Sequence, residues 1–301
     1  MHNIALEKNI IVPDFVGIIQ VLVYSSLYLS IAGGAMVFIS CSLQNFAFSP
    51  VAALIMVLVT YGVYNLNRKT DEAEDMMNHY ERYHFTKKYG SFLYKSSILA
   101  YVTAAGIGII FGTEALFMTL LPLIAGVLYS IPIFPKRIGF SRIKEVPVFK
   151  SLIVAVAWAI PPAFLPVYLS SSLPGFSTYV VALYFFILVF TSTVVFDIRD
   201  VKGDIVSGVR TIPVILGKEK TVVLLSALNI SAGLAIVYFG LEVFSLYQVL
   251  FLSLSMVYVQ CYLIYSLREN ITKMIYEIFI DGKFIVLTGA YATLWCLLIC
   301  A

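Results

Sequence analysis

Long apolar runs, interrupted by short polar segments, make up nearly the whole chain. A bilayer-spanning helix needs about 20 apolar residues, and runs of that order recur at short, steady intervals. We predict nine spans, at about 16–40, 49–66, 92–112, 115–133, 148–168, 177–196, 220–239, 245–266 and 280–300. Because this spacing leaves no room for a soluble domain, residues 1–301 are expected to form a single all-α integral-membrane domain.

The composition agrees with a multi-pass membrane protein. Apolar residues are 60% of the chain, charged residues only 12%, and the mean hydropathy is +0.93, whereas a soluble domain has roughly 25% charged residues. The four cysteines lie in or at the ends of spans without CxxC spacing, and the three histidines have no metal-ligand spacing. We therefore interpret the cysteines as packing residues and assign the histidines no chemistry.

The Lys and Arg residues predict the orientation. All 20 are compatible with one face of the membrane, and the opposite loops, near 41–48, 112–115, 168–177 and 240–245, carry none. Since short loops retain Lys and Arg in the cytoplasm, we expect the amino terminus inside and the protein in the cytoplasmic membrane. The net charge of +3 thus reflects basic residues that gather on one side of the membrane. No loop supplies the basic groove that nucleic acid would need. No obligate protein partner is evident.

Two Asp-rich stretches begin where apolar runs stop, in expected loops at about 67–91 and 197–219. Their polar positions recur every three or four residues, which keeps them on one face of a helix. They are Asn67, Asp71 and Asp75 in the first stretch and Asp197, Asp200 and Asp204 in the second. A single charge run is by default a solvated helix end. Two such stretches on the same side of the membrane, four spans apart, predict two carboxylate stripes that face each other. They would form a cap at the cytoplasmic mouth of the bundle.

Facing carboxylates repel each other, by roughly 3 kcal/mol for a pair about 6 Å apart at an effective dielectric near 20. A cation is therefore expected between them, and Mg²⁺ typically binds one or two carboxylates, water and substrate phosphates. Nearby basic residues could donate charge-assisted hydrogen bonds to phosphate. They are Arg68, Lys69, Lys136, Arg137, Lys144, Arg199 and Lys202. Since no GxxxxGK(S/T) loop is present for a nucleotide, a lipid diphosphate with an isoprenoid tail fits best.

The two stretches resemble the motifs of the UbiA superfamily of membrane prenyltransferases, NxxxDxxxD and DxxDxxxD. The chain contains both in full, as Asn67-x-x-x-Asp71-x-x-x-Asp75 and Asp197-x-x-Asp200-x-x-x-Asp204. The separation of the motifs and the nine-span layout are also those of the family, so the resemblance covers nearly the whole chain. The segments 203–217 and 128–137 are similar to the family as well.

The resemblance implies a Mg²⁺-dependent enzyme that transfers a prenyl group from an isoprenyl diphosphate to a lipophilic acceptor and releases diphosphate. The metal ligands it implies are Asn67, Asp71, Asp75, Asp197, Asp200 and Asp204. The expected diphosphate contacts are Asn67, Arg68, Lys136, Lys144, Arg199 and Lys202. The expected catalytic residues are Asp71, Asp75, Asp200, Asp204 and Tyr129.

Aromatic rings can stabilise an allylic carbocation by cation–π attraction. We nominate Tyr129 and, after it, Tyr64 for this role. A tyrosine of the interfacial belt is the alternative for Tyr129.

The acceptor is less constrained: a quinone-ring precursor or other aromatic, or a glycerol-phosphate lipid. The aromatic-acid branch of the family tends to carry an Arg in or before its first span, whereas residues 9–67 contain no Lys or Arg. This departure disfavours a carboxylated aromatic acceptor. Residue 68 is also Arg rather than the Asp frequent in relatives, which leaves the metal count open.

A transporter of cations or phosphate metabolites is the alternative function, because acidic residues in spans often mark ion paths. Transporters place the site near the midplane. Here the acids cluster at one end, and the far half carries only Glu114 and Glu242. A structural membrane protein, the third class, would not need two metal-like stripes.

Overall fold

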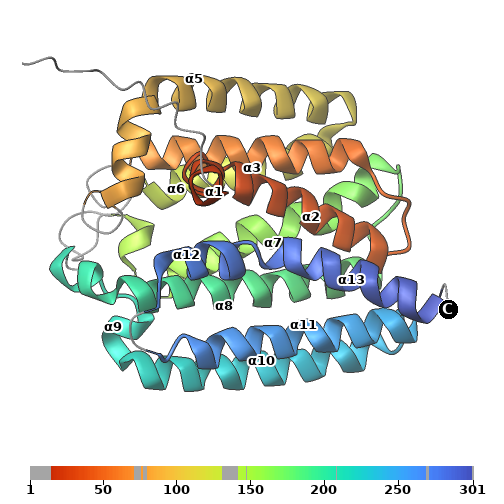
Figure 1. The fold of residues 1–301 in the computed structure, drawn as a ribbon. Helices are drawn as coiled ribbons and strands as arrows, with labels where there is room; N and C mark the ends of the chain where they lie inside the picture. Colours follow the sequence, from red (N-terminus) through yellow and green to blue (C-terminus); the bar gives the residue numbers. More distant parts are fainter. Residues whose placement is uncertain are drawn as a thin grey trace, which may run out of the picture.

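The described part of the chain is a bundle of helices (Figure 1). This computed structural model describes residues 15–70, 76, 80–130, 142–146, 148–207, 209–268 and 271–299. The first half contains α1 (Phe15–Tyr24), α2 (Leu27–Leu43), α3 (Pro50–Thr70), α5 (Tyr80–Ile110) and α6 (Thr113–Ser130). The second half contains η2 (Ile143–Glu145), α7 (Phe149–Leu169), α8 (Phe176–Ser207), α9 (Ile212–Leu216), α10 (Lys218–Gly240), α11 (Leu246–Tyr265), α12 (Lys273–Ile275), the π-helical η3 (Tyr276–Asp281) and α13 (Lys283–Ile299).

Six of these helices, α3, α5, α7, α8, α10 and α11, are long and apolar enough to cross a membrane. The bent pair α1–α2 meets the same test as a unit, while α6 and α13 are shorter apolar helices. The all-α, polytopic membrane architecture expected from the hydrophobic runs is confirmed. The expected number of nine spans stays a prediction, because the shorter helices do not meet the length criterion.

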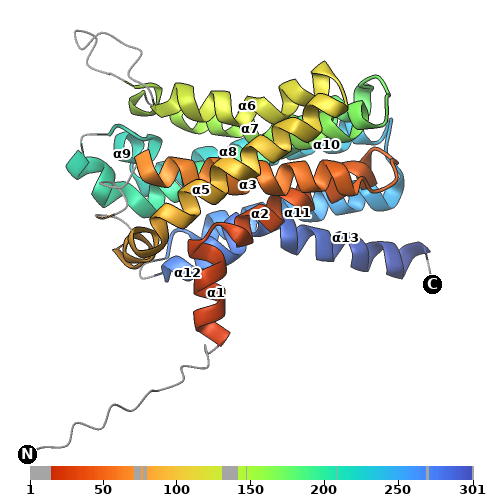
Figure 2. The same ribbon diagram turned by 90° about the horizontal axis from the view of Figure 1, so that it is seen from above.

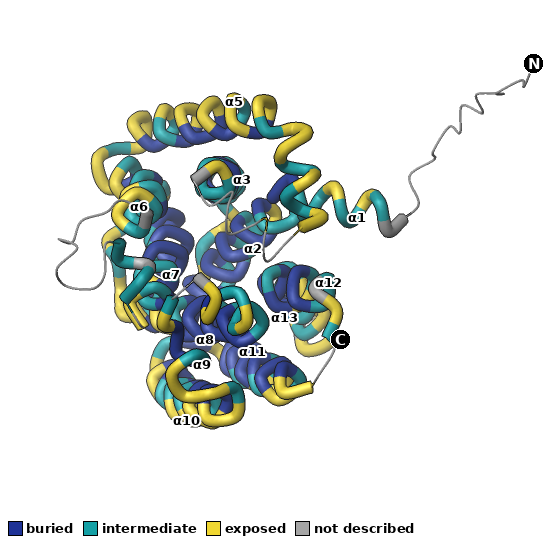
Figure 3. The backbone as a smooth tube through the Cα atoms, turned by 90° about the vertical axis from the view of Figure 1, so that its left-hand side faces the viewer, coloured by how far each residue is buried: buried dark blue, intermediate teal, exposed yellow. Residues whose placement is uncertain are grey.

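The core of the bundle lies between α2, α3, α7 and α8, which appear near the centre when the bundle is seen end-on (Figure 3). Their inward side chains, such as Val37, Ile55, Ala155 and Leu188, are fully buried. Small residues allow the backbones to approach closely, as is usual between membrane helices. At Gly33 of α2 an added Cβ would lie 3.1 Å from the Met56 carbonyl oxygen of α3.

The helix α1 turns away from the bundle (Figure 2), because the chain breaks between it and α2. Ser26 has φ 66°, a left-handed conformation that ends the first helix, and the two helices bend by 70° at this point. The Ser26 carbonyl then accepts a hydrogen bond from the Ser30 hydroxyl at 2.7 Å. The break brings the end of α1 close to the charged end of α3.

Two helices extend past the apolar runs from which we predicted them. Instead of ending near 196, α8 continues to Ser207, and its 32 residues correspond to about 48 Å, more than the roughly 30 Å hydrocarbon layer. Similarly, α3 continues to Thr70. The start of the first Asp-rich stretch and all of the second are therefore helical, which keeps their side chains at fixed angles.

A π-helical turn, η3, precedes the last apolar helix, which begins at Lys283 rather than at 280. The turn is tied to α2 by the Tyr28 hydroxyl, which donates to the Ile278 carbonyl at 2.8 Å. Gly282 is required here, since a methyl group at this position would overlap the Tyr28 hydroxyl and the Ile278 carbonyl. Asp281 thus lies just before the membrane helix, facing the interior.

Candidate active site

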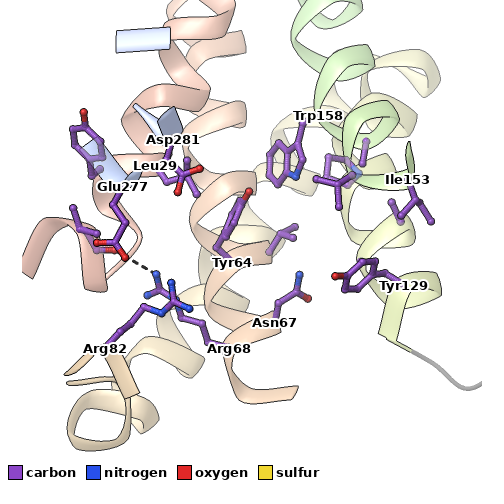
Figure 4. A pocket seen from close by; sticks show the side chains of 18 residues that line it. Leu29, Tyr64, Asn67, Arg68, Arg82, Tyr129, Ile153, Trp158, Glu277 and Asp281 are labelled. Carbon is purple, nitrogen blue, oxygen red and sulfur yellow. Dashed lines mark hydrogen bonds between the residues drawn. The ribbon is translucent and has the colours of Figure 1, made fainter. Parts of the chain in front are cut away.

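A cavity of about 270 Å³ lies at the end of the bundle where α3 carries the first Asp-rich stretch (Figure 4). One wall is apolar and consists of α6 and α7, with Ala125, Gly126, Ile153 and Val154 among its residues. The opposite wall comes from α1, α2, α3, α5 and η3 and carries the charged residues, which are Arg68, Arg82, Glu277 and Asp281. The cavity therefore has one side suited to a hydrocarbon and one suited to a polar group.

Aromatic side chains lie between these walls. Tyr64 and Trp158 are stacked, with ring centroids 5.4 Å apart and an interplanar angle of 29°. Tyr64 is one helical turn before Asn67 on α3, and Tyr129 reaches the cavity from α6 (Figure 4). The two tyrosines nominated from the sequence thus line one cavity together with Asn67, and Trp158 joins them.

Arg68 also lines the cavity, but its guanidinium donates to backbone carbonyls of α1. These are the carbonyls of Tyr24 and of Val23, the latter at 3.3 Å. The Val23 carbonyl also accepts from the Ser26 N–H at 3.1 Å. Since the last carbonyls of a helix have no partner within it, Arg68 caps the end of α1. Its contact with a diphosphate stays a prediction.

The carboxylates of the second Asp-rich stretch have separate basic or hydroxyl partners. Asp197 forms a buried ion pair with Lys150 of α7 at 2.7 Å and accepts from the Ser151 hydroxyl at 3.3 Å. Asp200 accepts two hydrogen bonds from the guanidinium of Arg199, at 2.7 and 2.8 Å. Asp204 is buried and accepts from the Thr211 hydroxyl at 3.1 Å.

Lys150 connects this stretch to the cavity. It lies one turn before the cavity residues Ile153 and Val154, and its ammonium attracts Asp204 as well as Asp197. Of the other nominated basic residues, Lys202 is exposed. Lys136 and the side chain of Lys144 lie outside the described residues, as do Asp71 and Asp75.

Four charged residues near the cavity were not nominated from the sequence: Arg82, Glu277, Asp281 and Lys283. The carboxylate of Glu277 points toward Arg82 at the mouth of the cavity (Figure 4). Burial raises the pKa of Asp281 to about 6, although Lys283 and Arg199 oppose the shift. A second cavity of about 100 Å³ adjoins the first, with which it shares Tyr64, Trp158 and Asp281.

Comparison with known proteins identifies the family. The family model of the UbiA prenyltransferase family matches residues 51–281, more than half of the chain. The chain belongs to the UbiA prenyltransferase family. As a member of this family the protein is a transferase of prenyl groups, which confirms the resemblance seen in its two motifs. None of the curated proteins matches the sequence.

Solved structures of UbiA proteins share the fold. A UbiA homologue from Archaeoglobus fulgidus bound to GPP and Mg²⁺ has a TM-score of 0.68 at 14% identity, and the match covers 94% of this chain and 100% of that one. The apo UbiA homologue from Aeropyrum pernix K1 has the same TM-score at 14% identity, covering 88% and 96%. A digeranylgeranylglyceryl phosphate synthase gives 0.60 at 14%, covering 93% and 97%. At this identity the likeness is one of fold.

The residues of this UbiA protein suit a hard cation such as Mg²⁺, because the donors are carboxylate oxygens. Asp197 already faces a cation, the Lys150 ammonium. Within the described residues, however, no three Asp, Glu, His or Cys side chains gather as a metal-binding group. The second stretch would therefore need ligands from elsewhere, and Asp71 and Asp75 are the residues of the right chemistry.

Sequence reasoning missed Lys150, Trp158 and the charged residues of η3 and α13. Lys150 had been counted only among the residues that set the orientation, and Asp281 and Lys283 fell in the predicted ninth span. The signal that could have found them is an ionisable residue at the start of an apolar run. Burial of such a residue requires a partner, which indicates a site.

Proposed function

We propose that this protein transfers a prenyl group from an isoprenyl diphosphate to a lipophilic acceptor in a Mg²⁺-dependent reaction. The observation that supports it most directly is the two-sided cavity, whose stacked Tyr64 and Trp158 and apolar α6–α7 wall lie next to Asn67 of the first motif. The family membership supports prenyl transfer in general; the metal, the donor and the acceptor are the parts proposed here.

The carboxylates of Asp71, Asp75, Asp197, Asp200 and Asp204, with the amide oxygen of Asn67, would hold Mg²⁺. When bound, Mg²⁺ would supply Lewis-acid stabilisation of the diphosphate and make it a better leaving group. The basic residues Arg68, Lys136, Lys144, Arg199 and Lys202 would hold the diphosphate oxygens. We add Lys150 to them, because it adjoins both the cavity wall and Asp197.

The reaction breaks the bond between the allylic carbon and the diphosphate oxygen, and the electron pair leaves with diphosphate. The resulting positive charge on the allylic fragment faces Tyr64, Tyr129 and Trp158, whose rings attract it. The apolar wall excludes water that would otherwise capture the cation. The nucleophilic atom of the acceptor then bonds to the allylic carbon and gives up its proton. The acceptor is an aromatic quinone-ring precursor or a glycerol-phosphate lipid.

The test uses purified protein in detergent with prenyl diphosphates of several lengths and a lipid extract of the host. Released diphosphate is measured with and without Mg²⁺, and products are identified by mass spectrometry. Asp200→Ala and Asp204→Ala are expected to abolish Mg²⁺-dependent release, while Glu242→Gln on the opposite side serves as the control and is expected to match the wild type. Unchanged turnover in both Asp variants would contradict the proposal.

A further inference from the structure

Lys283 lies in the interior of the bundle with no carboxylate against it. Lys283 is only 4% exposed. Among the described residues, no carboxylate oxygen lies within 4.0 Å of the Lys283 ammonium. Asp281 is the nearby acidic group and attracts it from a greater distance. An unpaired buried charge is costly, and ionisable residues inside membrane proteins usually serve a site.

Two of the three ammonium protons are held in place. Lys283 Nζ donates to the Ser192 hydroxyl of α8 at 2.9 Å and to the Ile280 carbonyl at 3.2 Å. The Ser192 hydroxyl proton is itself directed to the Val189 carbonyl at 2.9 Å, so that its lone pairs face the ammonium. An ammonium has three donors. The third N–H has no hydrogen-bond acceptor among the described residues. The ammonium lies over the Phe284 ring, 4.7 Å from its centroid, and Lys283 lines the cavity of about 100 Å³.

Lys283 lies deeper in the bundle than the carboxylates of the second motif. Ser192 precedes Asp197 by five residues on α8, which places it about 7.5 Å deeper along the helix. The small cavity adjoins the larger one at Tyr64 and Trp158. A group held at Lys283 would thus lie below the diphosphate and beside the aromatic residues, where the acceptor must approach the allylic carbon.

We propose that Lys283, positioned by Ser192, binds an anionic oxygen on the head group of the prenyl acceptor. The inference rests on the proposed function and narrows its acceptor to molecules with a compact acidic group, either a carboxylate or phenolate on one ring or the phosphate of a glycerol lipid. The small cavity, about 100 Å³, is below the roughly 150 Å³ of an engineered cavity that benzene occupies. It therefore admits the acidic group, while the rest of the acceptor lies in the adjoining cavity of about 270 Å³. Lys283 also changes the expectation from the sequence, because α13 supplies the cation that the first two spans lack.

The test measures binding without donor, metal or turnover. Purified protein is titrated with benzoate and its neutral counterpart benzamide, and with glycerol 1-phosphate and its counterpart glycerol, and the thermal midpoint is followed at each concentration. The wild type is expected to bind one of the anions roughly 10-fold or more tightly than its neutral counterpart, because hydrogen bonds to a charged donor are the strong ones. The preferred anion identifies the class of acceptor.

Lys283→Met is expected to abolish this preference, and Lys220→Met, at an exposed lysine of α10, to retain it. The methionine variant is expected to fold, because among the described residues no carboxylate lies within 4.0 Å of Lys283 to be left without its ion-pair partner. Lys283→Gln, which keeps a polar group but no charge, is a second variant with the same expected loss. The proposal would be overturned if the wild type preferred neither anion over its neutral counterpart. It would also be overturned if the preference survived in whichever of the two variants folds. Absence of diphosphate release would instead contradict the proposed function and leave the anion preference measurable.

Discussion

Removing Lys150 is expected to destabilise the protein through the carboxylate it leaves behind. In Lys150→Met, Asp197 keeps the hydrogen bond from the Ser151 hydroxyl at 3.3 Å but loses its cation. Breaking a buried ion pair by removing one partner costs about 3–5 kcal/mol. The side chains of Lys150 and Asp197 are 22% and 5% exposed, and partial exposure of the lysine weakens the pair, so we expect a loss of about 2–3 kcal/mol.

The measurement is the free energy of unfolding in detergent, followed by circular dichroism in denaturant. The double variant Lys150→Met with Asp197→Asn should regain most of the loss, because no buried charge remains. Added Mg²⁺ should stabilise Lys150→Met more than the wild type if Asp197 is a metal ligand, since the ion no longer competes with the ammonium. Equal stability of the single variant and the wild type would refute the ion-pair reasoning, as would a double variant no more stable than the single one.

Three further predictions concern the cavity. Gly282→Ala should lower the free energy of unfolding in detergent by roughly 1–3 kcal/mol, the cost of overpacking, since the added methyl group overlaps the end of the Tyr28 side chain and the Ile278 carbonyl. The loss is expected to shrink when Tyr28→Ala removes the whole ring, and an equal loss in both backgrounds would contradict this cause. Asp281→Asn should stabilise the protein by about 3 kcal/mol near pH 7 and by almost nothing below about pH 4, because a carboxylate with a raised folded pKa opposes folding only while it is ionised. Unfolding of the two proteins as a function of pH checks this, and parallel stability curves would contradict it. Tyr64→Leu should slow turnover by roughly 5- to 30-fold through loss of about 1–2 kcal/mol of cation–π attraction, whereas Tyr64→Phe keeps the ring stacked on Trp158 and should retain most of the rate of diphosphate release.

The architecture was predictable because the membrane restricts a chain to few choices. A long apolar run must form a helix in hydrocarbon, where every backbone polar group needs an internal partner. The ends of helices were less predictable. The polar residues after Phe196 no longer favour the bilayer, yet they continue the helix of α8 to Ser207, so hydropathy marks where the apolar layer ends rather than where the helix does.

The side-chain partners at the site could not be read from the sequence. Lys150 and Asp197 are 47 residues apart on different helices, and nothing in their spacing indicates that α7 and α8 bring them together. Motif spacing placed Asp197, Asp200 and Asp204 on one helix, as observed, but did not show that each has a different partner. Asp281 and Lys283 were hidden by the apolar run that follows them.

The unequal helix lengths bear on the lipid that surrounds the protein. The neighbouring helices α2 and α13 have 17 residues each, which is about 25 Å, several ångströms less than the roughly 30 Å hydrocarbon layer. The central helix α8, by contrast, exceeds that layer by more than ten residues. A bilayer meets such a mismatch by thinning beside the short helices. We therefore expect the bilayer to be thinner along the described lengths of α2 and α13, and bilayers of shorter acyl chains to accommodate them at lower cost.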